Sequence, residues 1–256
     1  MDFSTVPEQV PEQAAQKSDN RRGNRGCIKI ENPQKKDHAD PPEGAHGLCL
    51  ANPARVAFIG GVGASKTTTL LNILARCADW KPFEHIYLMG PSGCLEGMQK
   101  GEYGLIDVTP LDRFPPLDYF AGRPGRSALI IDDKHLADLS KNSKNGPSQR
   151  ELADRVCGHV SSHHPGGLSI FVAQQTFVAI PPSIRRLMSH WVLFCNRIDR
   201  AGIPYIAKGV MLEKSTLERC FDFCTENPYD FLLITNQPDG RPRVRVNGWR
   251  GVRGLL

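Results

Sequence analysis

The chain has 256 residues, enough for one domain with a substantial core and too few for several full domains. Its 32 Lys and Arg exceed its 27 Asp and Glu, giving a net charge of +5 that permits a nucleic-acid partner without requiring one. No apolar run approaches the roughly 18 residues of a membrane span, and the N-terminal region lacks an apolar signal core. Eight cysteines occur without a C-x-x-C pair, which favours reduced thiols. We therefore expect an intracellular protein with no membrane partner.

Residues 1–50 are predicted to be a disordered basic and polar arm. They are rich in Gln, Lys, Arg, Asn, Asp and Pro and have few apolar side chains to bury. The basic clusters at 21–25 and 35–36 could contact phosphate or serve as a nuclear address, or simply be solvated. Residues 51–238 are expected to form the folded domain, and 239–256 a basic tail rich in Gly and Arg.

The run VAFIGGVGASKTTT at 56–69 predicts a buried strand that enters a phosphate-binding loop. In the motif G-x-x-x-x-G-K-[ST], backbone N–H groups surround phosphates, the lysine reaches the terminal phosphates and the hydroxyl binds Mg²⁺. Lys66 and Thr67 stand at those positions, and Ser65 replaces the second glycine. The alternative is a plain glycine-rich turn before a helix with a solvated lysine. The residues expected to bind nucleotide are Gly60, Gly61, Val62, Gly63, Ala64, Ser65, Lys66, Thr67 and Thr68.

After this loop, short apolar runs alternate with helical patterns, which indicates buried strands in a mostly parallel central sheet flanked by helices. The predicted strands are Ile86–Met89, Leu105–Val108, Ala128–Ile131, Leu168–Ala173, Trp191–Cys195 and Phe231–Ile234. Residues 112–126 contain several Pro, Gly and Asp and are expected to form a long loop. The fold class is therefore α/β.

Two aspartates follow the predicted strand Ala128–Ile131. A phosphate-binding loop needs a metal-binding carboxylate at the tip of a neighbouring strand, so we expect Asp132 to hold Mg²⁺ together with Thr67. Asp133 is then expected to orient and polarise the attacking water. The alternative is an ordinary strand that ends in an Asp-Asp turn.

Polar residues also follow the next predicted strand, Leu168–Ala173. We expect Gln174 to face the γ-phosphate, where its amide can bond both the phosphate and the attacking water. Arg185 and Arg186 come later, near the start of a predicted helix.

The order of these motifs resembles the FtsK–HerA superfamily of P-loop ATPases. Within it, the chain is most similar to the poxvirus-type DNA-packaging ATPases of double-stranded DNA viruses. The resemblance covers about residues 54–200. It is carried by the loop (Walker A), the strand ending Asp-Asp (Walker B), a histidine ten residues before a glutamine at a strand tip, and Pro-x-x-Ile-Arg.

This resemblance assigns roles to individual residues. It implies that the catalytic residues are Lys66, Asp133, Gln174 and Arg185, with Arg185 inserted into the neighbouring subunit's site. Arg186 is the alternative to Arg185 in that role, and His164 matches the family's histidine before the sensor strand. The sequence departs from the family pattern at two positions, with Ser65 in place of glycine and Asp133 in place of glutamate. We expect these departures to affect the rate of hydrolysis more than nucleotide binding.

The resemblance also implies a RecA-like P-loop NTPase fold and an enzyme that binds ATP and Mg²⁺. The expected function is ATP-driven translocation of viral double-stranded DNA into a preformed capsid by a homo-oligomer, a hexamer by resemblance. The expected partners are double-stranded DNA and a capsid or portal-vertex protein, in the host nucleus or cytoplasm or in association with the virion. A helicase or other nucleic-acid-remodelling ATPase is one alternative, and a catalytically weak nucleotide-binding assembly factor is another.

Two other patterns fit the sequence less well. Cys157, His159, His163 and His164 have side chains that can bind zinc, but their spacing lacks the usual cysteine pair. The loop also resembles that of the plasmid-partition ATPases, which carry an additional early lysine and a proline near the Walker B aspartate. Neither feature is present here.

Overall fold

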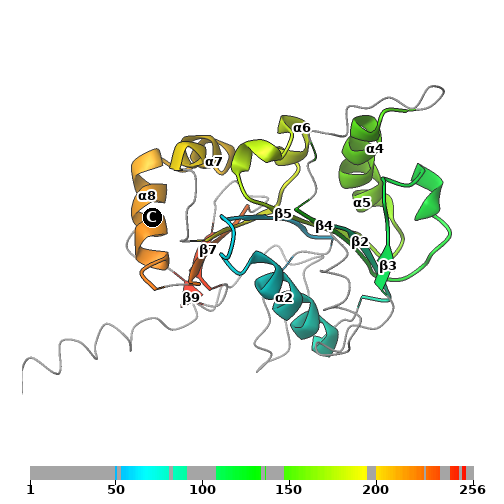
Figure 1. Cartoon of the computed structure of the whole chain (residues 1–256), viewed down its shortest axis with the longest axis horizontal. Coiled ribbons are helices and arrows are strands. Elements are labelled where there is room, and N and C mark those ends of the chain that lie inside the picture. Colours follow the sequence, from blue (N-terminus) through cyan, green and yellow to red (C-terminus); the bar gives the residue numbers. More distant parts are fainter. Residues whose placement is uncertain are drawn as a thin grey trace, which may run out of the picture.

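A nine-stranded sheet lies at the centre of the computed structural model, with helices on both faces (Figure 1). The structure describes residues 50, 53–80, 83–90, 108–133, 136, 147–194, 200–227, 229–236, 243–247 and 250–251. Within these residues the strand order is β3-β2-β4-β5-β1-β6-β7-β8-β9. The strands are β1 (Arg55–Ile59), β2 (His85–Met89), β3 (Val108–Pro110), β4 (Ser127–Asp132), β5 (Leu168–Gln174), β6 (His190–Phe194), β7 (Phe231–Thr235), β8 (Arg243–Val246) and β9 (Arg250–Gly251).

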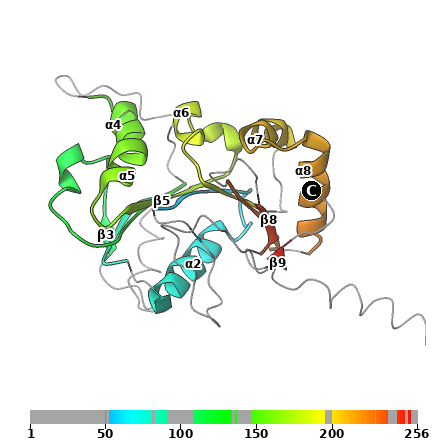
Figure 2. The same ribbon diagram turned by 180° about the vertical axis from the view of Figure 1, so that it is seen from behind.

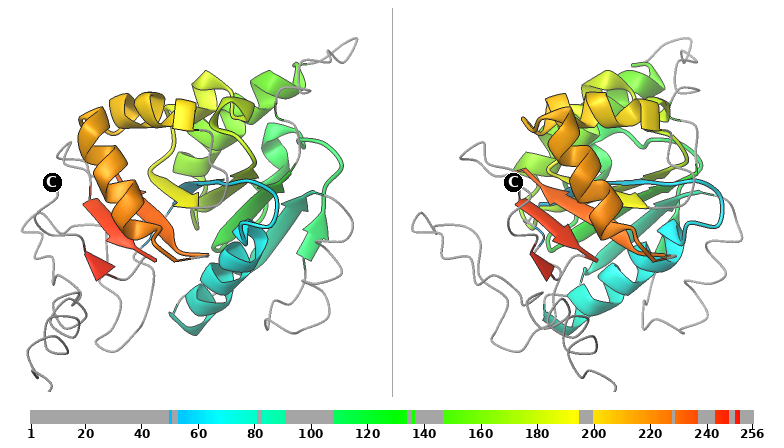
Figure 3. Two further views of the ribbon diagram at one scale, coloured as in Figure 1. Left: turned by 60° about the vertical axis from the view of Figure 1, so that its left-hand side comes forward. Right: turned by 90° about the vertical axis from the view of Figure 1, so that its left-hand side faces the viewer.

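The sheet is mixed, so the prediction of a mostly parallel sheet fits only part of it. Strands β3, β2, β4, β5, β1 and β6 run parallel, and the pairs β6–β7, β7–β8 and β8–β9 are antiparallel. Figure 3 shows β8 and β9 in red at one edge of the sheet, beside α8 (Lys214–Cys224). These two strands lie in the stretch 239–256, where the sequence had predicted only a basic tail.

Helices cover the two faces of the sheet unequally (Figures 1 and 2). Helix α2 (Lys66–Trp80) lies on one face, and the other α-helices within the described residues lie on the opposite face. These are α4 (Gln149–Arg155), α5 (Ser161–His163), α6 (Pro182–Arg185), α7 (Ile203–Gly209) and α8. The short helices η1 (Leu117–Tyr119), η3 (Val156–Val160, a π-helix), η4 (Phe177–Ala179) and η5 (Arg200–Gly202) connect the main elements.

The central parallel strands are mainly apolar, with polar residues at some of their ends, because both of their faces are covered. Along β1, Ala57 and Ile59 belong to the hydrophobic cluster under the large helical layer, whereas Val56 and Phe58 belong to the cluster under α2. Leu50, assigned by the sequence to the predicted arm, also packs in the cluster under α2. The rest of the arm 1–50, and residues 105–107 of one predicted strand, lie outside the described residues.

Cys157, His159 and His163 of the zinc pattern lie on one continuous helical segment, α4–η3–α5, and His164 follows its end. Cys157 lies in its π-helical turn and is fully buried, and burial, with a smaller effect from Asp154, raises the pKa of its thiol to about 12. A thiol that resists ionisation is a poor zinc ligand. Across the described residues, no group of three or more His, Cys, Asp or Glu side chains could hold a metal ion. In the same part of the chain, no helix has the length and apolarity needed to span a membrane.

His164 connects the long loop before β4 to the segment before β5. Its Nε2 donates to the carbonyl of Phe120 over 3.1 Å, and its own carbonyl accepts from Gly167 N over 2.9 Å. The imidazole is buried, with 7% of the residue exposed. Because β5 begins at Leu168 and rises about 3.3 Å per residue, His164 lies at the opposite end of this strand from Gln174.

We predict that His164→Ala lowers the free energy of unfolding by about 1–3 kcal/mol, because it leaves the buried Phe120 carbonyl without its donor. Nucleotide affinity should not change, since the substitution is at the other end of β5. Urea unfolding and nucleotide titration measure the two effects, with the exposed neighbour His163→Ala as the matched control. Loss of nucleotide affinity without loss of stability would instead place His164 in the functional site.

Candidate nucleotide-binding site

The predicted phosphate-binding loop (residues 60–68) emerges from the carboxyl end of β1 and leads into α2. Gly60 N donates to the carbonyl of Gln174 on the neighbouring strand over 3.2 Å, and Ala64 N donates to Gly61 O over 3.3 Å. Lys66 Nζ donates to the carbonyls of Gly60 and Gly61 over 2.8 and 3.1 Å. Only 8% of Lys66 is exposed, so its ammonium group lies within the turn of the loop.

Two residues of this loop have left-handed backbone conformations. Gly63 has φ 75° and Ser65 has φ 65°. Glycine adopts this region without steric cost, whereas a residue with a Cβ loses roughly 1 kcal/mol there. Ser65, which stands where the motif has its second glycine, therefore occupies the conformation that makes glycine favourable.

The predicted metal-binding pair is brought together by the fold. Thr67 Oγ1 donates to Asp132 Oδ2 over 2.9 Å, joining the start of α2 to the end of β4. Asp132 is 2% exposed. A hydroxyl and a carboxylate oxygen in contact are hard donors of the kind that Mg²⁺ prefers, so this pair fits the metal expected from the sequence.

Asp133 and Gln174 lie at the ends of adjacent strands. Asp133 N donates to the carbonyl of Ala173 over 3.1 Å, and the residue turns into the left-handed region with φ 49°. Asp133 is exposed, whereas Gln174 is 3% exposed. The fold therefore gathers Lys66, Thr67, Asp132, Asp133 and Gln174 at the carboxyl ends of β1, β4 and β5.

Arg185 lies on α6, in the helical layer. Its guanidinium stacks over the ring of Phe177, with Cζ 4.4 Å from the ring centroid, and its buried Nε has no hydrogen-bond partner among the described residues. Burial lowers the pKa of Arg185 from its ordinary value, and Tyr205 opposes that shift. Arg186 is exposed. These contacts all lie within one subunit, so they do not test the predicted action of Arg185 on the nucleotide site of a neighbouring subunit.

Sequence reasoning missed two residues that pack directly against the site. A Cβ on Gly90, which follows β2, would lie 3.1 Å from the carbonyl oxygen of Asp132, so a larger residue here would fit only if the end of β4 shifted by a few tenths of an ångström. Gly90 could have been noticed as a glycine at the end of a strand pattern. Phe194, at the end of β6, faces Gly60, and nothing in its local sequence distinguishes it from other core aromatic residues.

Comparison with known proteins gives structural matches only. No family model matches the chain, and no curated protein matches its sequence. The DNA-packaging ATPase B204 from Sulfolobus Turreted Icosahedral Virus is similar in fold, with a TM-score of 0.52 and 14% identity over 79% of this chain and 99% of that chain. The genome packaging NTPase B204 from Sulfolobus turreted icosahedral virus 2, in complex with sulfate, also has a TM-score of 0.52, with 16% identity over 75% of this chain and 96% of that chain. This likeness shows that the chain has the fold of a P-loop NTPase.

We predict that Ser65→Gly stabilises the protein by about 0.5–1 kcal/mol, because it removes the left-handed strain and the larger entropy of the unfolded glycine offsets only part of the gain. Nucleotide binding should be retained or improved. Ser65→Ala is the matched control, since it removes the hydroxyl but keeps the strained Cβ. Thermal unfolding and nucleotide titration of both variants test the prediction, and it is wrong if Ser65→Gly abolishes binding, which would make the serine hydroxyl a ligand.

Proposed function

We propose that this chain is an ATPase that uses ATP hydrolysis to move viral double-stranded DNA into a preformed capsid. The observation that carries the proposal is the Thr67–Asp132 hydrogen bond beside Lys66, because it joins the lysine, hydroxyl and carboxylate of a phosphate and metal site. The fold likeness to a DNA-packaging ATPase and a genome packaging NTPase supports the role in genome packaging. Membership of the poxvirus-type packaging group is part of the same proposal.

In the proposed mechanism, backbone N–H groups of the loop bind the phosphates, and Lys66 exchanges its contacts with the loop carbonyls for phosphate oxygens. Thr67 and Asp132 would hold Mg²⁺, which when bound supplies positive charge to the β- and γ-phosphate oxygens. Gln174 orients the attacking water and Asp133 polarises it. The water oxygen bonds to the γ-phosphorus as the bond to the bridging oxygen of ADP breaks, and the acceleration comes from positioning and electrostatic stabilisation.

The partners in this proposal follow from the same function. A homo-oligomer, with six subunits expected, would surround the duplex and contact its phosphates without reading base sequence. A capsid or portal-vertex protein would anchor the oligomer, in the host nucleus or cytoplasm or on the virion. The net charge of +5 is compatible with a polyanionic partner.

We predict that double-stranded DNA of any sequence stimulates steady-state ATP hydrolysis by the full chain. Stimulation should fall steeply with salt, with a log–log slope of about −4 if about four phosphates are neutralised per subunit. Lys66→Ala should reduce turnover by about 100-fold or more, because the transferring phosphoryl group loses a charge that stabilises it. Ion-exchange-purified parent and variant, assayed in parallel, exclude a contaminating ATPase.

Three outcomes would contradict the proposal in different ways. Equal turnover in the parent and Lys66→Ala would place hydrolysis elsewhere. Absence of turnover in the parent despite ATP binding would favour the nucleotide-binding assembly factor. DNA strand separation coupled to hydrolysis would favour the helicase.

We predict that Arg185 acts on the site of a neighbouring subunit, where a guanidinium would neutralise charge on the γ-phosphoryl oxygens and accelerate hydrolysis by about 10³-fold or more. Mixing Arg185→Ala subunits with Lys66→Ala subunits should then produce more activity than either variant alone. The gain arises because some sites would combine an intact loop with an intact arginine.

The same mixture made with Arg186→Ala is the matched control, since Arg186 is the exposed neighbour. A mixture no more active than the average of its components, with mixed oligomers shown to form, would rule out action of Arg185 between subunits.

A further inference from the structure

The first glycine of the phosphate-binding loop is fixed from both sides. On the β5 side, Gly60 N donates to Gln174 O over 3.2 Å. On the β6 side, a Cβ built on Gly60 would lie 2.9 Å from Phe194 Cβ and 3.3 Å from Phe194 Cδ2. The backbone of Gly60 is thus in direct van der Waals contact with the Phe194 side chain, at the point where the chain leaves β1.

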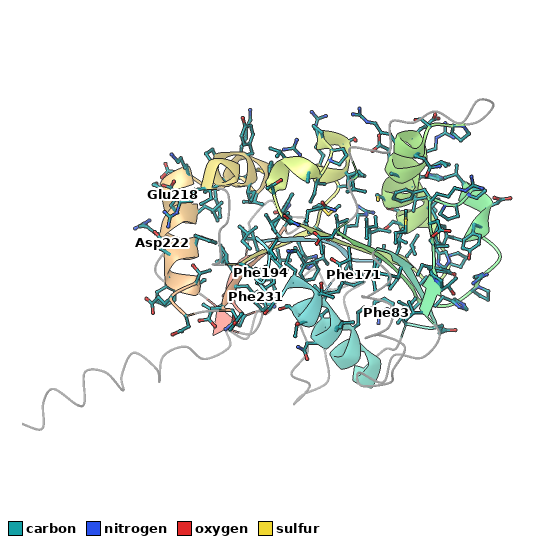
Figure 4. The ribbon with its side chains drawn as sticks, in the orientation of Figure 1. Phe83, Phe171, Phe194, Glu218, Asp222 and Phe231 are labelled. Carbon is teal, nitrogen blue, oxygen red and sulfur yellow. The ribbon has the colours of Figure 1, made fainter. Side chains whose placement is uncertain are left out.

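Phe194 is in turn supported from behind by a second ring. It is 1% exposed, it is paired with Phe231 of β7 in the antiparallel register, and the two ring centroids are 5.5 Å apart. Both rings belong to the hydrophobic cluster under α2, which also contains Ala64 of the loop. Figure 4 shows Phe194 and Phe231 together on the α2 side of the sheet.

We propose that Phe194, backed by Phe231, is a positioning residue that sets the conformation of the phosphate-binding loop and thereby its affinity for nucleotide phosphates. This inference rests on the proposed function, since it takes ATP and ADP as the ligands of the loop. A smaller side chain at position 194 keeps Cβ but loses the aromatic ring whose Cδ2 faces Gly60, so it would leave a cavity beside Gly60 into which the loop would relax. Backbone N–H groups bind phosphate well only when they are held within about 0.5 Å of their bound geometry.

The chain offers a matched control for a general loss of packing. Phe171 of β5 is 0% exposed, belongs to the same cluster and also pairs with a second ring, Phe83, over 6.0 Å. Its register partners are Val56 of β1 and Ile130 of β4, which lie before the strand ends, so it faces no residue of the loop in the sheet. Figure 4 labels this second pair farther along the same side of the sheet.

The experiment compares Phe194→Leu with Phe171→Leu in the full chain. Both should lower the melting temperature by a similar amount, about 3 °C for each kcal/mol lost. Phe194→Leu should raise the dissociation constants of ATP and ADP about tenfold, equivalent to about 1.4 kcal/mol, whereas Phe171→Leu should change them less than about twofold. Phe231→Leu should weaken binding in the same direction by about threefold.

Phe194→Met is the conservative variant, because its unbranched side chain fills irregular space, and it should restore most of the affinity. With Phe231→Leu, it keeps the inference testable if Phe194→Leu does not fold. A parent that binds ATP while Phe194→Leu and Phe171→Leu weaken binding equally would overturn the positioning role alone. A parent that binds neither ATP nor ADP would overturn the proposed function and this inference with it.

Discussion

The geometry of the site depends on β1 lying between β5 and β6 in parallel register. Ile59 is opposite Gln174 on one side and Leu193 on the other, so Gly60 necessarily emerges between two strand ends. Both faces of these strands are buried, and a shift of one residue would turn every side chain of β1 to the opposite face. Hydrophobic burial therefore fixes the register, and the register fixes where the loop begins.

The sequence was most informative for the strands that are buried on both faces. The predicted strand Ala128–Ile131 corresponds to β4, and the predicted strand Leu168–Ala173 to β5, because a continuous apolar run is what double coverage requires. Strand β8, between β7 and β9, was missed although Arg243–Val246 alternates charged and apolar residues, the pattern of a strand with one buried face. The charge and neighbouring glycines of this segment favour a tail. Its strand conformation depends on hydrogen bonding to β7, which local composition does not show.

The difference between local sequence patterns and contacts made only on folding also explains which parts of the site were predictable. The proximity of Lys66, Thr67 and Asp132 could be predicted because each lies in a short sequence motif, and the structure brings the three together. Phe194 could not, since its contact with Gly60 arises only when β6 pairs with β1. For His164, the sequence shows only that it precedes Gln174 by ten residues. The fold places it at the end of β5 opposite to Gln174, hydrogen-bonded to the carbonyl of Phe120.

Ser65 and Asp133, the two departures from the motifs that the sequence resembles, have different physical costs. Both Ser65 and Asp133 have positive φ, at 65° and 49°. Aspartate is enriched several-fold in the left-handed region, because its short polar side chain can bond locally, whereas the longer glutamate gains no such compensation. Asp133 therefore suits a turn that keeps its N–H bonded to the carbonyl of Ala173 over 3.1 Å. The backbone conformation at this strand end favours aspartate over glutamate. Serine has less compensation, so Ser65 is the departure whose strain the rest of the loop must overcome, through the contacts of Gly60 with Gln174 and Phe194.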